Sequence, residues 1–358
     1  MLRSHALFRA GLFACAFFPA LASAGVVNPD ISLIGQLRPG WTDDPTSVDK
    51  NRPTLNLGEA EVAADAALNP YASGTFVFSF ADGQAEVEEA YLRLDQALPW
   101  GLALKAGKYR APLGKLNPTH PHAYDFIDPP HILESSSGLI PGEESWNEPA
   151  VELSALLPGI ATWAPVLSVD VQKGAGFRTS QDTAPALSDY DSEREKTDLA
   201  WLVHLSNGFT IGDGLAGDLG FSLSQGTSNV ERDLKATIAG ADLKLKFDLG
   251  EGYRLAWQSE AIWRHDDHAE RDRLGWVSIL DWTRGRWNLG GLYEQLSFPS
   301  LGDVDDQSAK VFGGFSLLEE STLFRLAYER RWQTGIDPVN TVSAQILFSM
   351  GPHKPHQF

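Results

Sequence analysis

The chain has 358 residues, of which 47 are Asp or Glu and 29 are Lys or Arg, which gives a formal net charge of −18. This acidic balance excludes nucleic acid as a partner, because phosphate binding needs clustered Lys and Arg. The only cysteine is Cys15, so the chain after it has no disulfide framework and no thiolate metal site. No run of about 18 apolar residues follows the first segment, so we expect no membrane-spanning helix.

Residues 1–24 have the pattern of an export signal. Arg3 and Arg9 precede the apolar run Ala10–Leu21, and Ala22-Ser23-Ala24 is a small-residue cleavage site. Such a segment is removed on export and is too short for a membrane anchor. The residues before Cys15 loosely resemble a lipoprotein cleavage box, but the apolar run continues past them, which favours cleavage after Ala24. We therefore expect residues 25–358 to form the mature domain.

From Ile31 to Met350 the chain repeats stretches of about ten residues that alternate apolar and polar. In Ala241–Leu249, for example, every odd position is apolar and every even position is Asp or Lys. Because successive side chains of a strand point to opposite faces, this strand has one apolar face and one charged face. Repetition of the unit without intervening helices predicts an all-β fold, a single closed antiparallel transmembrane β-barrel. Only closure satisfies every backbone group of strands that cross lipid.

We predict sixteen strands, and fourteen remain an alternative because Ile31–Leu37 and Asp218–Gln225 are the weaker segments. The connectors alternate between short and long, as expected for short periplasmic turns and long extracellular loops. Sixteen strands are enough to enclose an aqueous channel. The other predicted strands are Leu55–Leu68, Tyr71–Ala81, Ala85–Ala97, Gly101–Arg110, Ala150–Leu157, Pro165–Lys173, Leu199–Ser206, Lys235–Leu249, Tyr253–Arg264, Leu274–Thr283, Arg286–Leu296, Gln307–Leu317, Thr322–Arg331 and Val339–Met350.

Aromatic residues gather at both ends of the predicted strands, as expected at the two membrane interfaces. A soluble sandwich or propeller is the alternative, but its strands are usually about five or six residues long. Strands of about ten residues match a tilted membrane strand instead. The aromatic residues are Tyr71, Trp100, Trp163, Tyr253 and Trp287 at the short turns, and Tyr109, Trp263, Trp276 and Trp332 at the long connections.

The longest connector, Ala111–Pro149, is rich in imidazole and carboxylate groups. These groups suit zinc, so we take His120, His122 and His131 as candidate metal ligands. His120 and His122 are two residues apart and would share a face only in an extended segment. The alternative is a rigid, proline-rich loop whose histidines hydrogen-bond to the barrel wall. A second candidate metal cluster contains His265 and His268, beside three carboxylates in a loop tip.

Several motifs resemble a proteobacterial outer-membrane porin-like family that is related in architecture to the phosphate-selective porins of the O/P type. Some members of this group are labelled zinc-regulated TonB-dependent outer-membrane receptors. The resemblance implies location in the outer membrane of a Gram-negative bacterium and a long loop, 111–149, folded into the pore after the fifth strand. The motifs are Asn28–Ile34, Leu57–Glu61, Val87–Tyr91, Lys105–Tyr109, His120–Phe126 and Gly351–Phe358.

The chain departs from two of the functions that this resemblance suggests. A TonB-dependent receptor needs a plug domain of more than a hundred residues before the barrel, and only about six residues separate the signal from Ile31, which favours passive diffusion. Phosphate selectivity is not expected either, because the long loop has Lys115 as its only basic residue. An enzyme is also disfavoured. His204 and Ser206 share one strand face, but no third group orients them.

We therefore predict a porin for small hydrophilic solutes or ions. The inward-facing charges have both signs with a modest acidic excess, which indicates a weak cation preference. The alternative is a zinc-binding uptake protein that uses the loop histidines. Expected partners are outer-membrane lipid and small solutes, a homotrimer is the candidate assembly, and zinc is the only candidate cofactor. The predicted selectivity residues are Lys115, Asp125, Asp128, Glu134, Glu143 and Glu144 in the loop, and Glu89, Arg93 and Lys105 in the wall.

Overall fold

The computed structural model describes residues 28–81, 83–95, 98–134, 137–142, 145–159, 162–178, 198–229, 233–267, 271–298, 304–317 and 321–352. The predicted signal segment, 1–24, lies outside these residues. The described chain consists of β-strands with a few short 3-10 helices. Within these ranges, no helix has the length and apolar character needed to cross a membrane.

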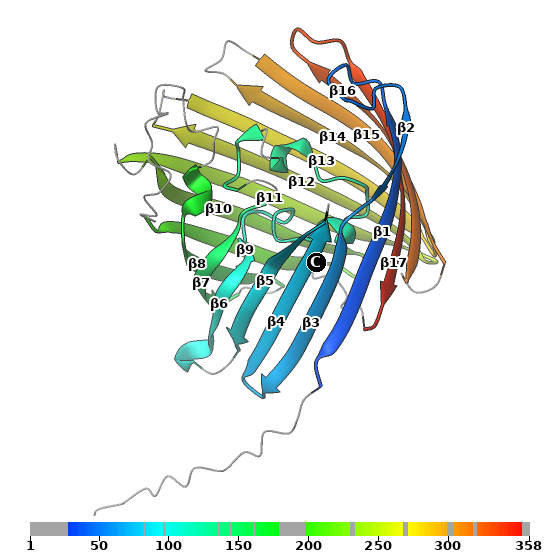
Figure 1. The fold of residues 1–358 in the computed structure, drawn as a ribbon. Coiled ribbons are helices and arrows are strands. Elements are labelled where there is room, and N and C mark those ends of the chain that lie inside the picture. Colours follow the sequence, from blue (N-terminus) through cyan, green and yellow to red (C-terminus); the bar gives the residue numbers. More distant parts are fainter. Residues whose placement is uncertain are drawn as a thin grey trace, which may run out of the picture.

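The strands run nearly the full height of the molecule and form one continuous antiparallel wall (Figure 1). Four 3-10 helices described here lie in the connections: η1 (Pro99–Gly101), η2 (Pro121–Ala123), η3 (His131–Leu133) and η5 (Ala175–Arg178). The strands are β1 (Asp30–Thr42), β2 (Pro53–Leu57), β3 (Ala60–Asn69), β4 (Ala72–Ala81), β5 (Gln84–Leu94), β6 (Leu102–Arg110), β7 (Asn147–Leu156), β8 (Ala164–Gln172), β9 (Ala200–Ile211), β10 (Leu215–Asn229), β11 (Leu234–Gly250), β12 (Tyr253–Asp266), β13 (Arg271–Arg284), β14 (Trp287–Phe298), β15 (Val304–Ser316), β16 (Thr322–Gln333) and β17 (Val339–Met350).

Pairing between the first and last strands closes the barrel. β1 pairs with β17 from Leu33↔Met350 to Thr42↔Thr341. On its other side β1 pairs with both β2 and β3, which therefore form one strand interrupted at Gly58. The seventeen segments thus make a sixteen-stranded barrel, and the predicted all-β closed fold with sixteen strands is confirmed. Closure leaves no exposed strand edge, which is the condition for strands in lipid.

One predicted turn is wrong. The connector Asn207–Gly217 is mostly strand, because β9 continues to Ile211 and β10 already begins at Leu215. The hairpin turns at Gly212, whose φ of 60° is the left-handed conformation that glycine adopts readily. Pairing of Leu215 with Ile211 extends the ladder to the end of the hairpin. This segment contains several Gly, Asp and Asn residues, which are typical of loops and obscure its alternation of apolar and polar residues.

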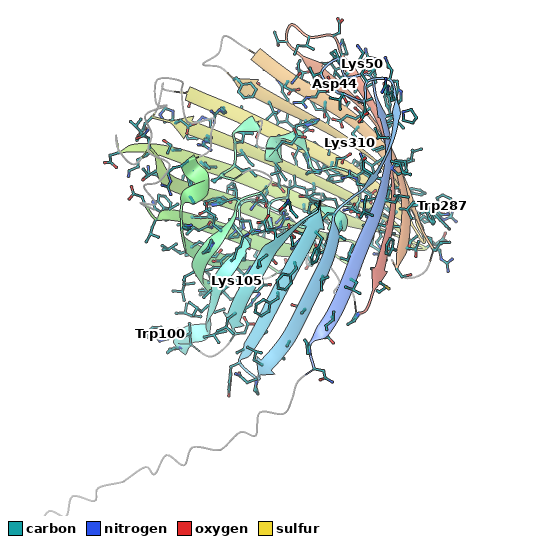
Figure 2. The ribbon with its side chains drawn as sticks, viewed as in Figure 1. Asp44, Lys50, Trp100, Lys105, Trp287 and Lys310 are labelled. Atoms are coloured by element: carbon teal, nitrogen blue, oxygen red, sulfur yellow. The ribbon has the colours of Figure 1, made fainter. Side chains whose placement is uncertain are left out.

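The two faces of the wall differ as the alternation predicts. Large apolar side chains on the outer face are exposed, for example Leu280 at 49% and Val311 at 58%. Inward-facing charged side chains such as Asp242 and Glu260 are almost fully buried, each at 2%. Many side chains project from both faces of the wall, and Trp100 and Trp287 lie at its rim (Figure 2). An apolar outer face of this kind fits contact with lipid.

The outer face of β13 offers a direct test. Leu280 lies between Trp276 and Trp282 on that face, near the middle of the apolar belt. Leu280→Arg should cost about 2–4 kcal/mol of folding free energy in a bilayer, because it places a cation near the midplane. The matched change on the inner face, Asp281→Asn, should fold normally. The measurement is unfolding of the refolded barrel in lipid vesicles, and equal stability of the two variants would contradict an outer lipid-facing surface.

Candidate pore constriction formed by the loop between β6 and β7

The connection between β6 and β7 crosses the interior of the barrel (Figure 1). We call its described residues, 111–134, 137–142 and 145–146, the interior loop. Its groups bond to inward side chains on widely separated strands, including Glu89 of β5, Asp242 of β11, Arg273 of β13 and Lys310 of β15. The loop is therefore held by strands on several sides of the barrel, not only by the two that it connects.

An apolar cluster holds the loop against the strands β11–β15. Leu113, Ile132 and Leu139 of the interior loop are each 0–1% exposed. They belong to one cluster with inward-facing wall residues such as Ile262 and Leu292. Part of the inner wall is thus apolar, which departs from the charged inner face that the alternation of Ala241–Leu249 suggested. Burial of this apolar surface stabilises the loop against the wall through the hydrophobic effect, which does not depend on direction.

The first polar anchor joins the start of the loop to β10, β11 and β12. The Lys115 Nζ lies 2.9 Å from Asp218 and 3.0 Å from Asp242. The backbone N–H groups of Lys115 and Leu116 donate to one carboxylate oxygen of Glu260, at 2.9 and 2.8 Å. Burial alone would lower the pKa of Lys115, but the two aspartates outweigh it and raise that pKa. The predicted selectivity residue Lys115 is therefore engaged with the wall.

The second anchor is His131 at the start of η3. Its Nδ1 lies 2.7 Å from Glu134 and its Nε2 lies 2.5 Å from Glu329 of β16. Burial alone would lower the pKa of His131, but the hydrogen bonds to Glu134 and Glu329, with the charge of Glu294, raise it to about 10. Arg331 of β16 also approaches the Nδ1 atom, at 3.4 Å. His131 is thus a buried cation at neutral pH, which suits an ionic anchor better than a metal ligand.

A third set of contacts fixes the middle of the loop. Asp128 pairs with Arg38 of β1, and the carbonyl oxygens of Ile127 and Asp128 accept hydrogen bonds from Lys310. The carbonyl of Asp125 accepts a hydrogen bond from Asn288 of β14 at 2.9 Å, while its carboxylate is exposed. Of the predicted loop acids that the structure describes, Asp125 is thus the one whose side chain is open to the interior space. A small cavity there is also lined by Lys244 and Asp281.

The histidine segment of the loop meets β3 and β5. His120 precedes η2 and His122 lies within it, and their ring centroids are 5.5 Å apart. The expectation that the two rings meet only in an extended segment is wrong, because the 3-10 turn at Pro121 brings them together. Both Nδ1 atoms face Glu61 of β3, His120 at 3.5 Å and His122 at 3.2 Å.

A β-bulge adds a further carboxylate to this histidine segment. Between β4 and β5 the register shifts at Val77 and Phe78, so that Glu88 has no partner of its own in the ladder. Glu88 reaches His120 Nδ1 at 3.1 Å, and Glu89 faces His120 Nε2 at 3.4 Å. Strict alternation would put only one of these two glutamates inside. The consecutive pair Glu88-Glu89 was the available signal, since an extra residue at a bulge breaks the alternation.

The pKa of His120 reflects these contacts. Burial alone would lower this pKa, but the carboxylates of Glu61, Glu88 and Glu89, which lie 3.1–3.5 Å from the ring nitrogens, outweigh burial and raise the pKa well above the usual value. Arg110 lies close by, bonded to Glu88 at 2.6 Å, and its charge acts in the opposite direction.

The wall residues predicted to set selectivity have different surroundings. Glu89 accepts a hydrogen bond from the backbone of Arg110, and Arg93 pairs with Asp95 at an exposed position. The Lys105 Nζ lies about 4 Å from two ring centroids, 4.2 Å from Tyr91 and 4.0 Å from Tyr109. Cation–π contacts of this kind hold the ammonium group in place. Arg93 is therefore the more exposed of the two predicted wall cations.

Gly107 allows β6 to approach the backbone of β5 closely. It pairs with Tyr91 in the ladder between β5 and β6 and has a φ of 140°. A Cβ atom here would lie 2.1 Å from the carbonyl oxygen of Ala90. Only glycine fits this close contact, so the motif Lys105–Tyr109 has a structural reason for its central residue.

The remaining candidates lie away from the interior loop or outside the described residues. His265 bonds to Asp272 at 3.0 Å at the end of β12. His268, Glu143 and Glu144 lie outside the residues that the structure describes. His204 Nδ1 lies 2.8 Å from the hydroxyl of Ser222, so its polar neighbour is on β10 and is not the expected Ser206. The His204 and Ser222 side chains are both buried.

Comparison of sequences identifies no family. No protein-family model matches the chain. A curated protein of Aquifex aeolicus (strain VF5), named only as uncharacterized, is 26% identical over 299 residues. These residues cover 79% of this chain and 53% of that protein, so the chain spans about half the length of the curated relative that it matches. The resemblance to phosphate-selective porins of the O/P type stays a prediction.

Solved structures with the same architecture are outer-membrane barrels. The outer membrane channel DcaP of Acinetobacter baumannii has a TM-score of 0.60 and 10% identity, covering 92% of this chain and 99% of that one. OmpT, an outer-membrane protein of Vibrio cholerae, has a TM-score of 0.58 and 11% identity, covering 90% and 98%. An anion-selective porin from Comamonas acidovorans has a TM-score of 0.56 and 8% identity, covering 90% and 100%. At these identities the likeness shows the fold.

The first anchor predicts a large effect of one substitution. Lys115→Met leaves Asp242, whose side chain has no exposed surface, without its cation. Breaking a buried pair in this way should cost about 3–5 kcal/mol, seen as faster protease cleavage of the interior loop and a lower unfolding free energy. The control is Lys108→Met. Its partner Glu86 is 66% exposed, so this change should cost about 0–1 kcal/mol. Equal effects would contradict a buried anchor at Lys115.

The second anchor predicts a pH dependence. The pKa of His131 is raised from 6.5 to about 10 in the folded protein, so the protonated imidazole stabilises the fold. That contribution is fully present below about pH 6.5 and is lost as the pH rises through about 10. The parent barrel should therefore lose stability over this interval relative to a His131→Gln variant, measured by unfolding at each pH. A constant difference between the two proteins from pH 6 to pH 11 would exclude a protonated anchor.

Proposed function

We propose that this protein is an outer-membrane porin through which small hydrophilic solutes or ions diffuse passively. The observation that carries the proposal is a closed barrel with an apolar outer face whose interior holds one long loop bonded to the wall on several sides. Structural neighbours named as a porin and as a channel support it. In this proposal the interior loop narrows the pore, and charges at its surface act on the passing solute.

The proposed location is the outer membrane of a Gram-negative bacterium. Structural neighbours that are outer-membrane proteins support this location, as does the apolar outer face. A homotrimer is the proposed assembly. It is supported by the trimer form in which OmpT of Vibrio cholerae was studied. A non-enzymatic role fits the position of His204, since a buried imidazole–hydroxyl pair beneath the loop offers no route to a bulky substrate.

A weak cation preference is the selectivity that we propose. Asp125 carries it, because its carboxylate is exposed while Lys115 and Asp128 are engaged with the wall. A carboxylate between low-dielectric walls acts on ions more strongly than the same group at an open surface. Lys244 beside it limits the preference, since the two charges have opposite signs.

A zinc-binding uptake protein that uses the loop histidines is the second candidate. The observation that favours it is the meeting of Glu61, His120 and His122, whose possible ligand atoms lie within 4.8 Å of one another. His131 fits this role poorly because both of its ring nitrogens already make short hydrogen bonds to carboxylates, at 2.7 and 2.5 Å, whereas the carboxylate oxygens around His120 lie 3.1–3.5 Å from its ring nitrogens. In an uptake protein zinc flux into vesicles would saturate, whereas flux through a passive porin rises in proportion to concentration.

Single-channel recording of the refolded protein tests the porin. Replacing residues 114–144 by a short Gly-Ser linker should raise the conductance, because it removes the segment that crosses the interior. Asp125→Asn should shift the reversal potential in a salt gradient towards anions, more at low salt than at high salt, because salt screens the charge. Asp49→Asn, in an exposed turn beyond β1, is the control and should shift it little.

These outcomes separate the parts of the proposal. No conductance from folded protein would refute the porin, and an unchanged conductance after loop replacement would refute the constriction. An equal shift for the Asp49 and Asp125 variants would remove Asp125 as the selectivity residue.

A further inference from the structure

The junction between the interior loop and the wall contains polar atoms that lie close together without a well-formed hydrogen bond. Oε2 of Glu61, Oε2 of Glu88 and Nδ1 of His120 are buried and approach one another to 3.1–3.5 Å as ion pairs, but none of the three makes a hydrogen bond of good geometry within the described residues. Glu61 itself is only 5% exposed. Buried polar atoms without partners are costly, so their presence together calls for a ligand that satisfies them.

The spacing of these atoms fits a metal ion. Nδ1 of His120 lies 3.5 Å from Oε2 of Glu61, Nδ1 of His122 lies 3.2 Å from the same oxygen, and Oε2 of Glu88 lies 3.1 Å from Nδ1 of His120. Ligand atoms about 2.0–2.1 Å from a tetrahedral zinc ion are about 3.3 Å from one another. The two separations from Glu61, 3.5 and 3.2 Å, lie on either side of that edge length, and the approach of Glu88 at 3.1 Å is close to it.

The surroundings of His120 have the form of a metal-binding histidine. While its Nδ1 faces Glu61, its Nε2 faces the carboxylate of Glu89 at 3.4 Å. Histidine ligands usually donate their second ring N–H to such an outer carboxylate, which fixes the ring and increases its basicity as a ligand. The register shift that brings Glu88 to the same junction adds a further oxygen.

Charge favours a divalent cation at this junction. Glu59, Glu61 and Glu88 bring oxygen atoms within 4.8 Å of one another, and Glu89 lies on the other side of the His120 ring. Arg110 pairs with Glu88. One divalent ion would offset two of the three carboxylate charges that remain and take the place of protons on the imidazole rings.

We propose that Glu61, His120 and His122 bind one transition-metal cation of the zinc class, which locks the interior loop to β3. Two ligands come from the loop and one from the wall, so the ion joins two segments that no covalent bond connects. Two imidazoles and one carboxylate suit zinc and its neighbours and do not suit magnesium, which prefers oxygen ligands.

The lock differs from an uptake site in its burial. The side chains of His120, His122 and Glu61 are 16%, 7% and 6% exposed, so the ion would lie between loop and wall and not on an open route. This inference depends on the fold and not on conduction. The metal site would remain supported if the protein conducted no ions, and the proposed porin function would remain supported if no metal bound.

The test uses the refolded full chain, stripped with a chelator, in detergent. Isothermal titration with zinc chloride should show one site per chain and no matching heat with magnesium chloride. Cobalt chloride should give the visible absorption of a tetrahedral ion, and zinc should slow protease cleavage of the interior loop. Glu61→Gln, which keeps the side-chain shape, should weaken zinc binding by at least about 10-fold, as even outer-sphere changes do.

Two further variants identify the site. His120→Ala with His122→Ala should abolish the tight site, while His265→Ala, in a cluster apart from the interior loop, should leave it intact. Tight zinc binding that persists in the double variant would place the site elsewhere, and so overturn the assignment. Absence of zinc binding to the folded parent would overturn the proposal outright. Zinc binding that does not slow protease cleavage of the interior loop would overturn the proposal that the ion joins the loop to β3.

Discussion

The structure depends on one constraint: a loop placed inside a barrel must find partners for its own polar groups. Water cannot serve them all, because the apolar cluster around Ile132 and Leu139 excludes it. The inner wall supplies the partners as carboxylates. Glu260 accepts two backbone N–H groups at the start of the loop, and Glu294 accepts the N–H of Ile132 at 3.2 Å. The loop thus depends on the wall for the partners of its buried N–H groups.

This constraint changes the meaning of the inward charges. A count of acidic and basic residues on the inner face treats every charge as open to a passing ion. In the structure, Asp242 is paired with Lys115, Glu329 with His131, and Asp306 with Arg331. The first two pairs hold the loop and the third joins β15 to β16, so these groups have little charge left to offer a solute. In the proposed porin, selectivity would therefore rest on the few groups that remain exposed, and the net charge of the chain would say little about it.

The sequence was enough to predict the barrel because the signal is repeated. All sixteen predicted strands overlap observed strands, since each has the same alternation and a membrane barrel tolerates little deviation from it. The misplaced turn at Asn207–Gly217 shows the limit: polar and glycine residues inside a strand have the composition of a turn. Only the pairing of Ile211 with Leu215, which is seen in the folded structure, distinguishes a strand from a turn here.

The site was predicted less well, for a physical reason. The residue types in the loop indicated which groups could bind a metal ion, and the structure does place His120 and His122 next to a carboxylate. Their partner Glu61, however, is about sixty residues away in sequence, and the contribution of Glu88 depends on a bulge. The packing of the loop against the inward-facing residues Ile262 and Leu292 could not be predicted either. In a sequence, an apolar residue that faces lipid cannot be distinguished from one that packs against protein.

These anchors also connect the position of the interior loop to the chemistry of the wall. The loop is attached at Glu260, at Glu61, at Glu329 and at Lys310, on strands around the barrel. Movement of the loop away from one strand must either break the other contacts or deform the loop, because each anchor is a directed bond of fixed length. The position of the loop is therefore set by all of the anchors at once. In the proposed porin, a change in charge at any one of them, by protonation or by a bound cation, would act on the width of the path past the loop as well as on its field.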